Sequence, residues 1–301
     1  MSRLGFVGLG AMGNRITKRL LGKGHEIFGY DIFPPEKAQD LVAQGMKWAD
    51  SGRTVCEQAD ITFVMVTNTK ALESAFGGPS GLLAGLGPGK LLVDMSTVSP
   101  SASRALPAQV RQKGADMLDA PVSGSVTMVE SGKLSVMVGG NRPAFERAKP
   151  VLQDIGQKVT YVGENGLALA MKVATNISVA VQMLAFSESV VLAEKAGVPR
   201  ETVIEILTSS AIASPLVQYK GPLVLQMAEQ AQFTTTMMQK DMTLALELAR
   251  ELHVPLPTGA AVNEMLSSAC AQGFGDKDFA ILYKVLAQMS GLGLAGAASL
   301  K

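Results

Sequence analysis

The sequence predicts an α/β protein, with a doubly wound parallel sheet followed by a long helix and an all-helical C-terminal domain. Short apolar runs of β type alternate with helical patterns as far as Gly163, which is typical of a parallel sheet with crossover helices. Beyond Gly163 the strand signals stop, and the remaining patterns have helical periodicity. The 301 residues also exceed the ~100–200 residues typical of one domain, so two domains are expected.

The first half of the chain supplies the strands of the predicted sheet. Helical patterns lie between several of them, for example at residues 11–24 and 101–114. The expected strands are residues 4–10, 26–31, 61–67, 90–97, 116–124, 134–140 and 158–163.

The second half begins with a run, residues 164–196, that contains no proline and only one glycine, Gly166. A single helix of about 30 residues would span ~45 Å, so we expect it to leave one domain and form the spine of the next. Further helical patterns cover residues 200–210, 221–230, 234–254, 257–273 and 279–290. The expected domains are therefore 1–163 and 164–290, with residues 291–301 as a small-residue tail of the composition found in disordered segments.

Composition and charge exclude several classes of protein. The hydrophobic fraction of 47% allows a sizeable core, and the net charge of +1 gives no basic surface for nucleic acid. Cys56 and Cys270 lack neighbours at metal-ligand spacing, so we expect free thiols, a reducing cytoplasmic location and no metal site. The apolar first strand follows the N-terminus almost directly, so no signal peptide is expected. We expect the long helix to be too polar for a membrane span, because eleven of its residues include Lys172, Thr175, Asn176, Ser178 and Gln182.

A glycine-rich turn follows the first strand and opens the first helix. Such a turn lets a pyrophosphate approach the backbone at a helix N-terminus, as in Rossmann-type dinucleotide-binding domains. Asp31 ends the second strand 18 residues after Gly13; it can accept both ribose hydroxyls of NAD and would repel the 2′-phosphate of NADP. The alternative is a turn used only for packing, with Asp31 solvated. The predicted cofactor residues of the turn are Gly8, Leu9, Gly10, Ala11, Met12 and Gly13.

Two further polar turns follow predicted strands. Ser123, Gly124 and Ser125 form a turn whose backbone N–H groups and hydroxyls can bind an anion; the alternative is a plain β-turn. Ser96 and Thr97 end another strand, at the sheet edge where α/β proteins bind ligands. There the alternative is that Ser99 or Thr97 caps a helix beginning near Pro100.

Lys172 is the one charge between Gly166 and Asn176 on the long helix, and Asn176 lies four residues further on the same face. If this helix begins at the domain boundary, its early turns flank the interdomain cleft. Burial there disfavours the ammonium and suits proton exchange with an alcohol or carbonyl oxygen. The alternative is a lysine that snorkels to the surface from a core helix. Lys240 and Asp241 lie on a later amphipathic helix, where a solvated polar face is the simpler interpretation.

Taken together, five ordered motifs resemble those of the β-hydroxyacid dehydrogenase family, over about residues 3–290. They are GFVGLGAMG, DMSTVSP, DAPVSGS followed by ESGKLSVMVGG, GLALAMKVATN and MQKDMTLALELA. The family includes 3-hydroxyisobutyrate dehydrogenase, tartronate semialdehyde reductase and the glyoxylate/succinic semialdehyde reductases.

The resemblance implies a role for each matching residue. Lys172 matches the family's catalytic lysine and Asn176 its asparagine partner. Ser123 and Gly124 match the turn that binds the substrate carboxylate, and we place Ser125 and Ser96 with them. Thr97 matches a residue beside the nicotinamide and Lys240 a lysine that closes over the cofactor. The family's loop over the cofactor's diphosphate and ribose matches Val66, Thr67 and Asn68.

Two departures from the family pattern bear on substrate and cofactor. Ser125 replaces the second glycine of many members, which favours the semialdehyde-reductase branch. The stretch GYDIFPPEK instead resembles the NAD-using 3-hydroxyisobutyrate branch. Because the two indications conflict, the sequence leaves the substrate open.

The sequence therefore predicts an NAD(H)-dependent oxidoreductase, with NADP less favoured, that acts on a small carboxylate-bearing 3-hydroxyacid or semialdehyde. The alternatives are an imine reductase-like enzyme, which usually has Asp or Tyr in place of Lys172, and a non-catalytic dinucleotide-binding module. The helical domain is too small to cover its spine helix on all sides, so a homodimer or homotetramer is expected.

Overall fold

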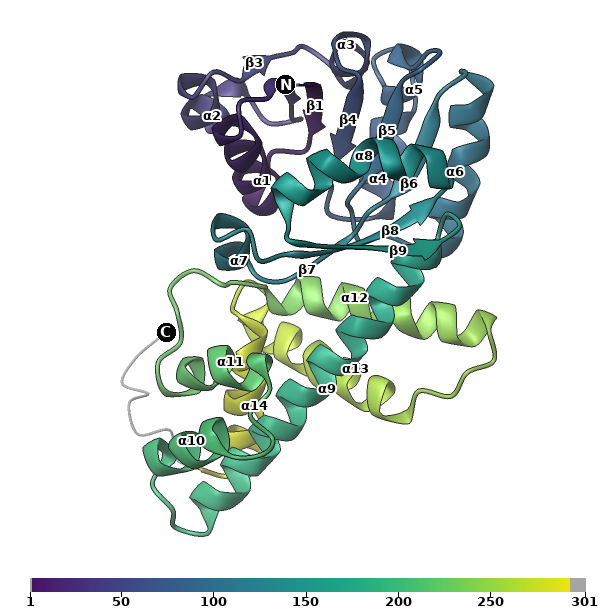
Figure 1. The fold of residues 1–301 in the computed structure, drawn as a ribbon. Helices are drawn as coiled ribbons and strands as arrows, with labels where there is room; N and C mark the ends of the chain where they lie inside the picture. The colour runs from purple at the N-terminus through teal and green to yellow at the C-terminus, as the bar shows by residue number, and fades with distance from the viewer. Residues whose placement is uncertain (1, 293–301) are drawn as a thin grey trace. The chain divides into compact units, whose positions relative to one another are not determined.

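The computed structural model describes residues 2–292, apart from the side chains of Val126 and Thr127. Its chain divides between Lys172 and Val173 into two compact units, which we call the sheet unit and the helical unit (Figure 1). The predicted fold class is confirmed. Gly163 ends the last strand, whereas the division itself lies inside the long helix. The predicted tail lies outside the described residues from position 293 onward.

The sheet unit contains a nine-stranded sheet in the order β3-β2-β1-β4-β5-β6-β8-β7, with β9 paired to β8. The strands from β3 to β6 in this order pair in parallel. The chain order reverses between β1 and β4, which is the switch point where open α/β sheets bind ligands. The strands are β1 (Arg3–Val7), β2 (Glu26–Tyr30), β3 (Lys47–Trp48), β4 (Ile61–Val64), β5 (Leu91–Asp94), β6 (Asp116–Asp119), β7 (Val122–Ser123), β8 (Ser135–Gly140) and β9 (Lys158–Gly163).

Helices cover both faces of this sheet (Figure 1). Phe6 and Phe63 of the strands pack on one side with Ile16 and Phe145 of the helices. That side carries α1 (Ala11–Gly22), the 3-10 turn η1 (Pro35–Ala38), α2 (Gln39–Ala43) and α8 (Arg142–Ile155). Val64 belongs to the core of the other side, with α3 (Gly52–Gln58), α4 (Thr69–Phe76), α5 (Leu82–Gly85) and α6 (Pro100–Gln112).

The last strands differ from the predicted all-parallel sheet. The expected strand 116–124 is broken into β6 and β7 around Pro121, which has no N–H to donate to a ladder. β8 runs antiparallel to β6, and β7 also pairs antiparallel to β8. Only the five-residue α7 (Val126–Glu130) lies between β7 and β8, and a parallel crossover needs a dozen or more residues. The sheet is therefore mixed at this end.

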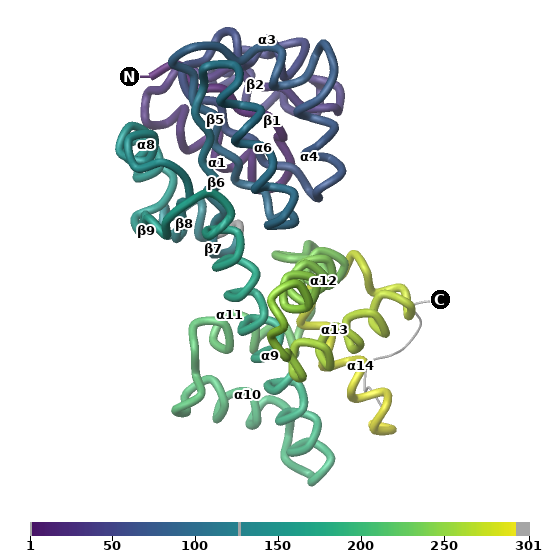
Figure 2. The backbone as a smooth tube through the Cα atoms, turned by 90° about the vertical axis from the view of Figure 1, so that its right-hand side faces the viewer, coloured from purple at the N-terminus to yellow at the C-terminus, as the bar shows by residue number. Residues whose placement is uncertain are grey.

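The helical unit is built around α9 (Leu167–Lys195), close to its predicted extent. In the view of Figure 2, α10 and α11 lie on one side of α9 and α12, α13 and α14 on the other. α11 begins earlier than predicted because Ser214 caps it and Pro215 occupies its first position. The bounds are α10 (Arg200–Ser209), α11 (Pro215–Leu225), α12 (Thr235–Glu251), α13 (Pro257–Ala269), the π-helical η2 (Cys270–Phe274), the 3-10 turn η3 (Phe279–Ile281) and α14 (Leu282–Met289).

By length and composition, α9 is apolar enough to cross a membrane, with a mean hydropathy of 1.5 over its best window. In this structure the helix supplies Met183, Phe186 and Val190 to the core of the helical unit, where they meet residues of α10 to α14. Core helices of globular domains pass the same composition test. We therefore interpret α9 as a core helix.

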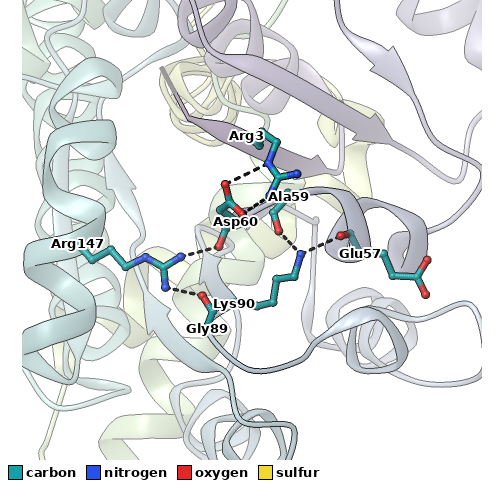
Figure 3. A network of polar contacts seen from close by, with 7 residues as sticks. All are labelled: Arg3, Glu57, Ala59, Asp60, Gly89, Lys90 and Arg147. Carbon is teal, nitrogen blue, oxygen red and sulfur yellow. Dashed lines mark hydrogen bonds and ion pairs between the residues drawn. The ribbon is translucent and has the colours of Figure 1, made fainter.

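A network of hydrogen bonds stabilises the edge of the sheet at which the parallel strands begin (Figure 3). The Lys90 ammonium donates to the carbonyl oxygens of Glu57 at 2.8 Å and Ala59 at 2.7 Å, at the C-terminal end of α3. The Arg147 guanidinium donates to the carbonyl oxygen of Asp60, just before β4. Cations at a helix C-terminus are stabilising. This network lies at the edge opposite to the carboxyl ends of the parallel strands.

Candidate active site

The carboxyl ends of the parallel strands bring most of the predicted site residues to one edge of the sheet unit. The glycine turn follows β1, and Asp31 follows β2. The loop 66–68 follows β4, and Ser96 and Thr97 follow β5. The turn 123–125 ends β7, and Lys172 is the last residue of the same unit. Asn176 and Lys240 belong to the helical unit.

The glycine turn has a distinct physical reason for each glycine. Gly8 has a φ of +95°, and a Cβ there would lie 2.1 Å from the Met65 carbonyl oxygen. A Cβ on Gly13 would lie 2.0 Å from the carbonyl oxygen of Gly8, so strand and helix could not pack as they do. A Cβ on Gly10 would meet nothing within 4 Å, and no side chain caps the N-terminus of α1 at this residue. The turn therefore leaves open backbone where a pyrophosphate would approach, and it fits a dinucleotide.

Asp31 is tied to the glycine turn. Its Oδ2 accepts a hydrogen bond from the Leu9 N–H at 2.6 Å, and its Oδ1 accepts one from the Phe33 N–H at 3.2 Å. The carboxylate is therefore held beside the turn, at the position where the ribose hydroxyls of a dinucleotide bind. The next residue, Ile32, is 85% exposed and supplies no positive charge.

Ser96 joins two of the loops at this edge. Its Oγ accepts a hydrogen bond from the Val66 N–H at 2.9 Å, and its own N–H donates to Asp94 Oδ1 at 2.9 Å. Ser96 and Asp94 are both buried, and burial raises the pKa of Asp94 to about 7. The hydroxyl of Ser96 thus holds the loop after β4 against the loop after β5.

Helix caps account for two further polar residues. Asn68 caps α4, because its Oδ1 accepts a hydrogen bond from the Ala71 N–H at 2.9 Å. Ser99 caps α6 through the Ala102 N–H at 3.3 Å, as one sequence alternative expects. Thr97 lies between these capped elements and is half-buried.

The turn after β7 depends on Gly124. This residue has a φ of +136° and is exposed, and a Cβ there would lie 2.7 Å from the Leu134 side chain. Ser123 pairs with Ser135 of β8, which fixes one side of the turn. On the other side, the Ser125 carbonyl oxygen accepts a hydrogen bond from the Met128 N–H. The turn is therefore anchored at both ends and open at Gly124.

Within the helical unit, Asn176 is part of a buried polar cluster that sequence reasoning missed. Its side-chain amide donates to a carboxylate oxygen of Asp241 on α12, and the Lys240 ammonium lies 3.0 Å from Asp241 Oδ1. The solvated polar face expected for Asp241 is wrong, because this residue is only 1% exposed. Its spacing to Met238 and Ala245 follows the apolar stripe of α12, and this was the signal that could have found it.

No group of three or more His, Cys, Asp or Glu side chains that could hold a metal ion occurs among residues 2–292. The predicted site residues at the carboxyl edge of the sheet instead include hydroxyls, the Asp31 carboxylate and the Lys172 amine. These groups bind sugars and carboxylates or exchange protons.

Comparison with known proteins identifies the family. Residues 3–163 match the model for the NAD-binding domain of 6-phosphogluconate dehydrogenase. Residues 166–286 match the model for the NAD-binding region of NADP-dependent 3-hydroxyisobutyrate dehydrogenase. The 2-(hydroxymethyl)glutarate dehydrogenase of Eubacterium barkeri is 34% identical over 98% of both chains.

Two further proteins resemble the chain over almost its whole length. The 2-hydroxy-3-oxopropionate reductase of Escherichia coli is 35% identical, over 97% of this chain and 100% of that enzyme. The structure of 3-hydroxyisobutyrate dehydrogenase from Mycobacterium tuberculosis, with L-serine, has a TM-score of 0.84 at 29% identity, covering 95% of this chain and 99% of that one. With the open glycine turn and the ordered motifs, these matches show that the chain belongs to the β-hydroxyacid dehydrogenase family of NAD(P)-dependent oxidoreductases.

Proposed function

We propose that the protein transfers hydride between NAD(H) and a small carboxylate-bearing 3-hydroxyacid or semialdehyde, with Lys172 as general acid and base. The observation that carries this proposal is the start of α9. The helix begins at the carboxyl edge of the sheet, where the Gly166 and Leu169 N–H groups bond to Asp119 at the end of β6. Lys172 follows one turn later in the same unit as the glycine turn and the 123–125 turn.

Lys172 exchanges the proton of the reacting oxygen. In oxidation, the neutral amine accepts the hydroxyl proton, and in reduction the ammonium donates a proton to the carbonyl oxygen. The bound nicotinamide supplies the hydride acceptor or donor. We assign to Asn176 the orientation of the lysine or of the same oxygen, since it lies one turn further along α9.

The substrate carboxylate is assigned to the 123–125 turn. Ser123 and Ser125 each supply a hydroxyl, and the backbone N–H groups around the exposed Gly124 add further donors. Ser96 holds the Val66 loop from within, so we assign it a positioning role at this edge instead of a direct contact with substrate. The substrate class is supported by the relatives named above, whose names describe hydroxy and oxo forms of small carboxylic acids.

We assign the cofactor to the glycine turn, the loop 66–68, Thr97 and Lys240. Asp31 favours NAD over NADP, because a carboxylate beside the ribose repels a 2′-phosphate. The next residues, Ile32 and Phe33, carry no positive charge that could bind such a phosphate.

The two alternative functions are not favoured. The relatives above 30% identity are named as a dehydrogenase and a reductase of hydroxy- or oxoacids, and Lys172 stands where imine reductases usually have Asp or Tyr. A non-catalytic binding module would need neither this lysine nor an anchored turn such as 123–125.

The test begins with a screen of small 3-hydroxyacids and semialdehydes against NAD(H) and NADP(H). On the best substrate, Lys172→Met should lower turnover by roughly 10²–10⁴-fold, the usual scale for one acid–base group, and remove the limb of the pH profile that reports the amine. Lys195→Met is the matched control, because it makes the same change on the same helix, where the exposed lysine donates to the Ser290 carbonyl oxygen, away from the predicted site residues. A Lys172→Met enzyme within threefold of wild type would reject the proposed mechanism.

We also propose that the chain forms a homodimer or homotetramer through the helical unit. This unit exposes large apolar side chains, among them Leu192 at 74%, Met289 at 67% and Ile206 at 56%. Exposed large apolar side chains are the material from which association surfaces are built. Light scattering at micromolar concentration should give the mass of at least two chains, and a monomer would contradict the proposal.

We propose a cytoplasmic location, which rests on cysteine chemistry. Cys56 and Cys270 are both free thiols, and Cys56 is buried. Thiols persist in reducing compartments. Fractionation of cells that produce the protein would test this location.

A further inference from the structure

Asp119 is a buried carboxylate to which the sequence analysis assigned no role. It ends β6 and is fully buried. Its Oδ1 accepts a hydrogen bond from the Gly166 N–H at 2.9 Å, and its Oδ2 accepts one from the Leu169 N–H at 3.2 Å. The carboxylate thus satisfies two backbone donors at the start of α9, which otherwise have no acceptor within the helix.

The surroundings of Asp119 are shaped to hold this carboxylate. The Asn165 side-chain amide donates to Oδ1 at 3.3 Å and to the Met117 carbonyl oxygen at 3.0 Å. Gly139 of β8 pairs with Asp119, and a Cβ on this glycine would lie 2.8 and 2.9 Å from the two carboxylate oxygens. Gly166 has a φ of +88°, which lets the chain turn sharply from β9 into α9. Only glycine at position 139 leaves room for the carboxylate to reach the helix.

The Asp119 carboxylate also connects the two parts of the proposed active site, which are the 123–125 turn and Lys172. Ser123 follows Asp119 four residues along the chain, at the end of β7. On α9, Lys172 follows Leu169 by three residues, so the two side chains lie on neighbouring turns of one face. Leu169 is itself buried in a core of the sheet unit. Asp119 therefore joins the strand that leads into the substrate turn to the helical turn that carries the lysine.

We propose that Asp119 is a positioning residue for Lys172, and this inference rests on the proposed function. By bonding to the first turn of α9, Asp119 holds the direction of the helix relative to the 123–125 turn, and so sets the distance between the lysine amine and a carboxylate-anchored substrate. A misplacement of about 1 Å between reacting groups can cost about 10²-fold in rate. The contribution of Asp119 should therefore appear in turnover and not only in stability.

The test uses Asp119→Asn, which keeps the size of the side chain but replaces one acceptor oxygen with an NH₂ group that faces backbone donors. We expect kcat to fall by about 10–100-fold, with KM for the carboxylate substrate and the dissociation constant of NAD each within about threefold. The amine limb of the pH profile should shift. Amide hydrogen exchange at Gly166 and Leu169 should become about tenfold faster, which reports on the helix start independently of activity.

Lys90→Met is the matched control. Lys90 also makes two charge-assisted hydrogen bonds to backbone at a helix end in the sheet unit, but at the opposite edge of the sheet (Figure 3). This variant should lose stability while its kcat, its pH profile and exchange at Leu169 stay at wild-type values. Asn165→Ala serves as a milder second variant, because it removes the side-chain donor that helps to fix the Asp119 carboxylate and so loosens both helix bonds. Exchange at Leu169 should become faster, and kcat should fall about threefold or more.

The outcomes separate this inference from the proposed function. If Lys172→Met abolishes turnover while Asp119→Asn folds and retains wild-type kcat and pH profile, Asp119 has only a structural role and the inference is overturned. If Asp119→Asn does not fold, Asn165→Ala decides, and wild-type kcat together with wild-type exchange at Leu169 would overturn it. A Lys172→Met enzyme that remains active instead refutes the proposed function itself.

Discussion

The side-chain amide of Asn176 on α9 donates to the buried carboxylate of Asp241 on α12, the same carboxylate that lies 3.0 Å from the Lys240 ammonium. The family resemblance assigns separate roles to Asn176 and Lys240. Both contact Asp241, for which the sequence predicted a solvent-exposed position. A buried carboxylate that loses a donor retains its desolvation cost, so this cluster should be sensitive to removal of any one member.

The first prediction concerns this cluster. Asn176→Ala should lower the free energy of unfolding by about 1–3 kcal/mol, because the Asp241 carboxylate loses a hydrogen-bond donor while it stays buried. Urea unfolding followed by circular dichroism measures the loss. Ser189→Ala on the same helix is the control, since the half-buried Ser189 hydroxyl donates to the Ala185 carbonyl oxygen of its own helix and its loss should change stability by less than about 0.5 kcal/mol. Equal losses in the two variants would contradict the importance of the cluster.

The second prediction separates the cofactor role of the glycine turn from its packing role. Gly10 has an ordinary φ of −65° and open space where a Cβ would stand, so Gly10→Ala should fold with unchanged or slightly higher stability. It should nevertheless weaken NAD binding at least tenfold, because the methyl group occupies the approach of the pyrophosphate. Gly13→Ala should instead destabilise the fold by about 1–3 kcal/mol or more through its clash with Gly8. Calorimetric titration with NAD and thermal unfolding together distinguish the two; normal NAD affinity in Gly10→Ala would remove the dinucleotide from this turn.

The third prediction concerns cofactor preference. Wild-type protein should have a higher kcat/KM with NAD(H) than with NADP(H), because the Asp31 carboxylate, held beside the glycine turn by the Leu9 N–H, would repel a 2′-phosphate. The double variant Asp31→Ser with Ile32→Arg should shift the ratio toward NADP(H), since it removes a carboxylate and adds a guanidinium that suits a phosphate. Steady-state kinetics with both cofactors on one substrate measure the ratio. A wild-type preference for NADP(H) would show that Asp31 does not read the ribose.

The fourth prediction concerns Asp94 of β5, which pairs in register with Asp119 of β6. Burial raises the pKa of Asp94 to about 7 from 3.8, and its Oδ2 has no hydrogen-bond partner among the described residues. Between pH 3.8 and about pH 7, the Asp94 carboxyl is protonated in the folded chain and ionised in the unfolded chain. The stability contributed by this proton is therefore complete below about pH 4 and is lost as the pH rises through 7, by at most about 1.4 kcal/mol per pH unit.

Asp94→Asn tests this linkage, because the amide cannot ionise and can still accept from the Ser96 N–H. The stability of wild type relative to Asp94→Asn, from urea unfolding at several pH values, should decline between pH 4 and 7 and then level off. A constant difference across this range would mean that Asp94 does not titrate as its burial implies.

Local sequence patterns were sufficient for β1, β2, β4 and β5, for α9 and for the glycine turn, whereas the two-residue strand β3 was not predicted. Each of these depends on interactions within a short segment: apolar periodicity, a glycine at a positive φ, or a helix without proline. Patterns were insufficient where the outcome depended on a partner distant in sequence. The break of the expected strand at Pro121 and the antiparallel pairing of β8 follow from the geometry of chain return, and the start of α11 depends on the Ser214 cap.

The sequence by itself therefore determined the family, the class of cofactor and the residue types available for chemistry, because these are written in contiguous motifs such as the 8–13 turn and the 123–125 turn. Only the tertiary structure decided what the buried acids do. In sequence, Asp119 lies between Leu118 and Ala120 and Asp241 between Lys240 and Met242, and neither context says what the carboxylate bonds to. The fold gives Asp119 two backbone donors from α9, which lie 47 and 50 residues away, and gives Asp241 an amide 65 residues away. A carboxylate is costly to bury without such donors, and the chain brings them to it only when the whole domain has formed.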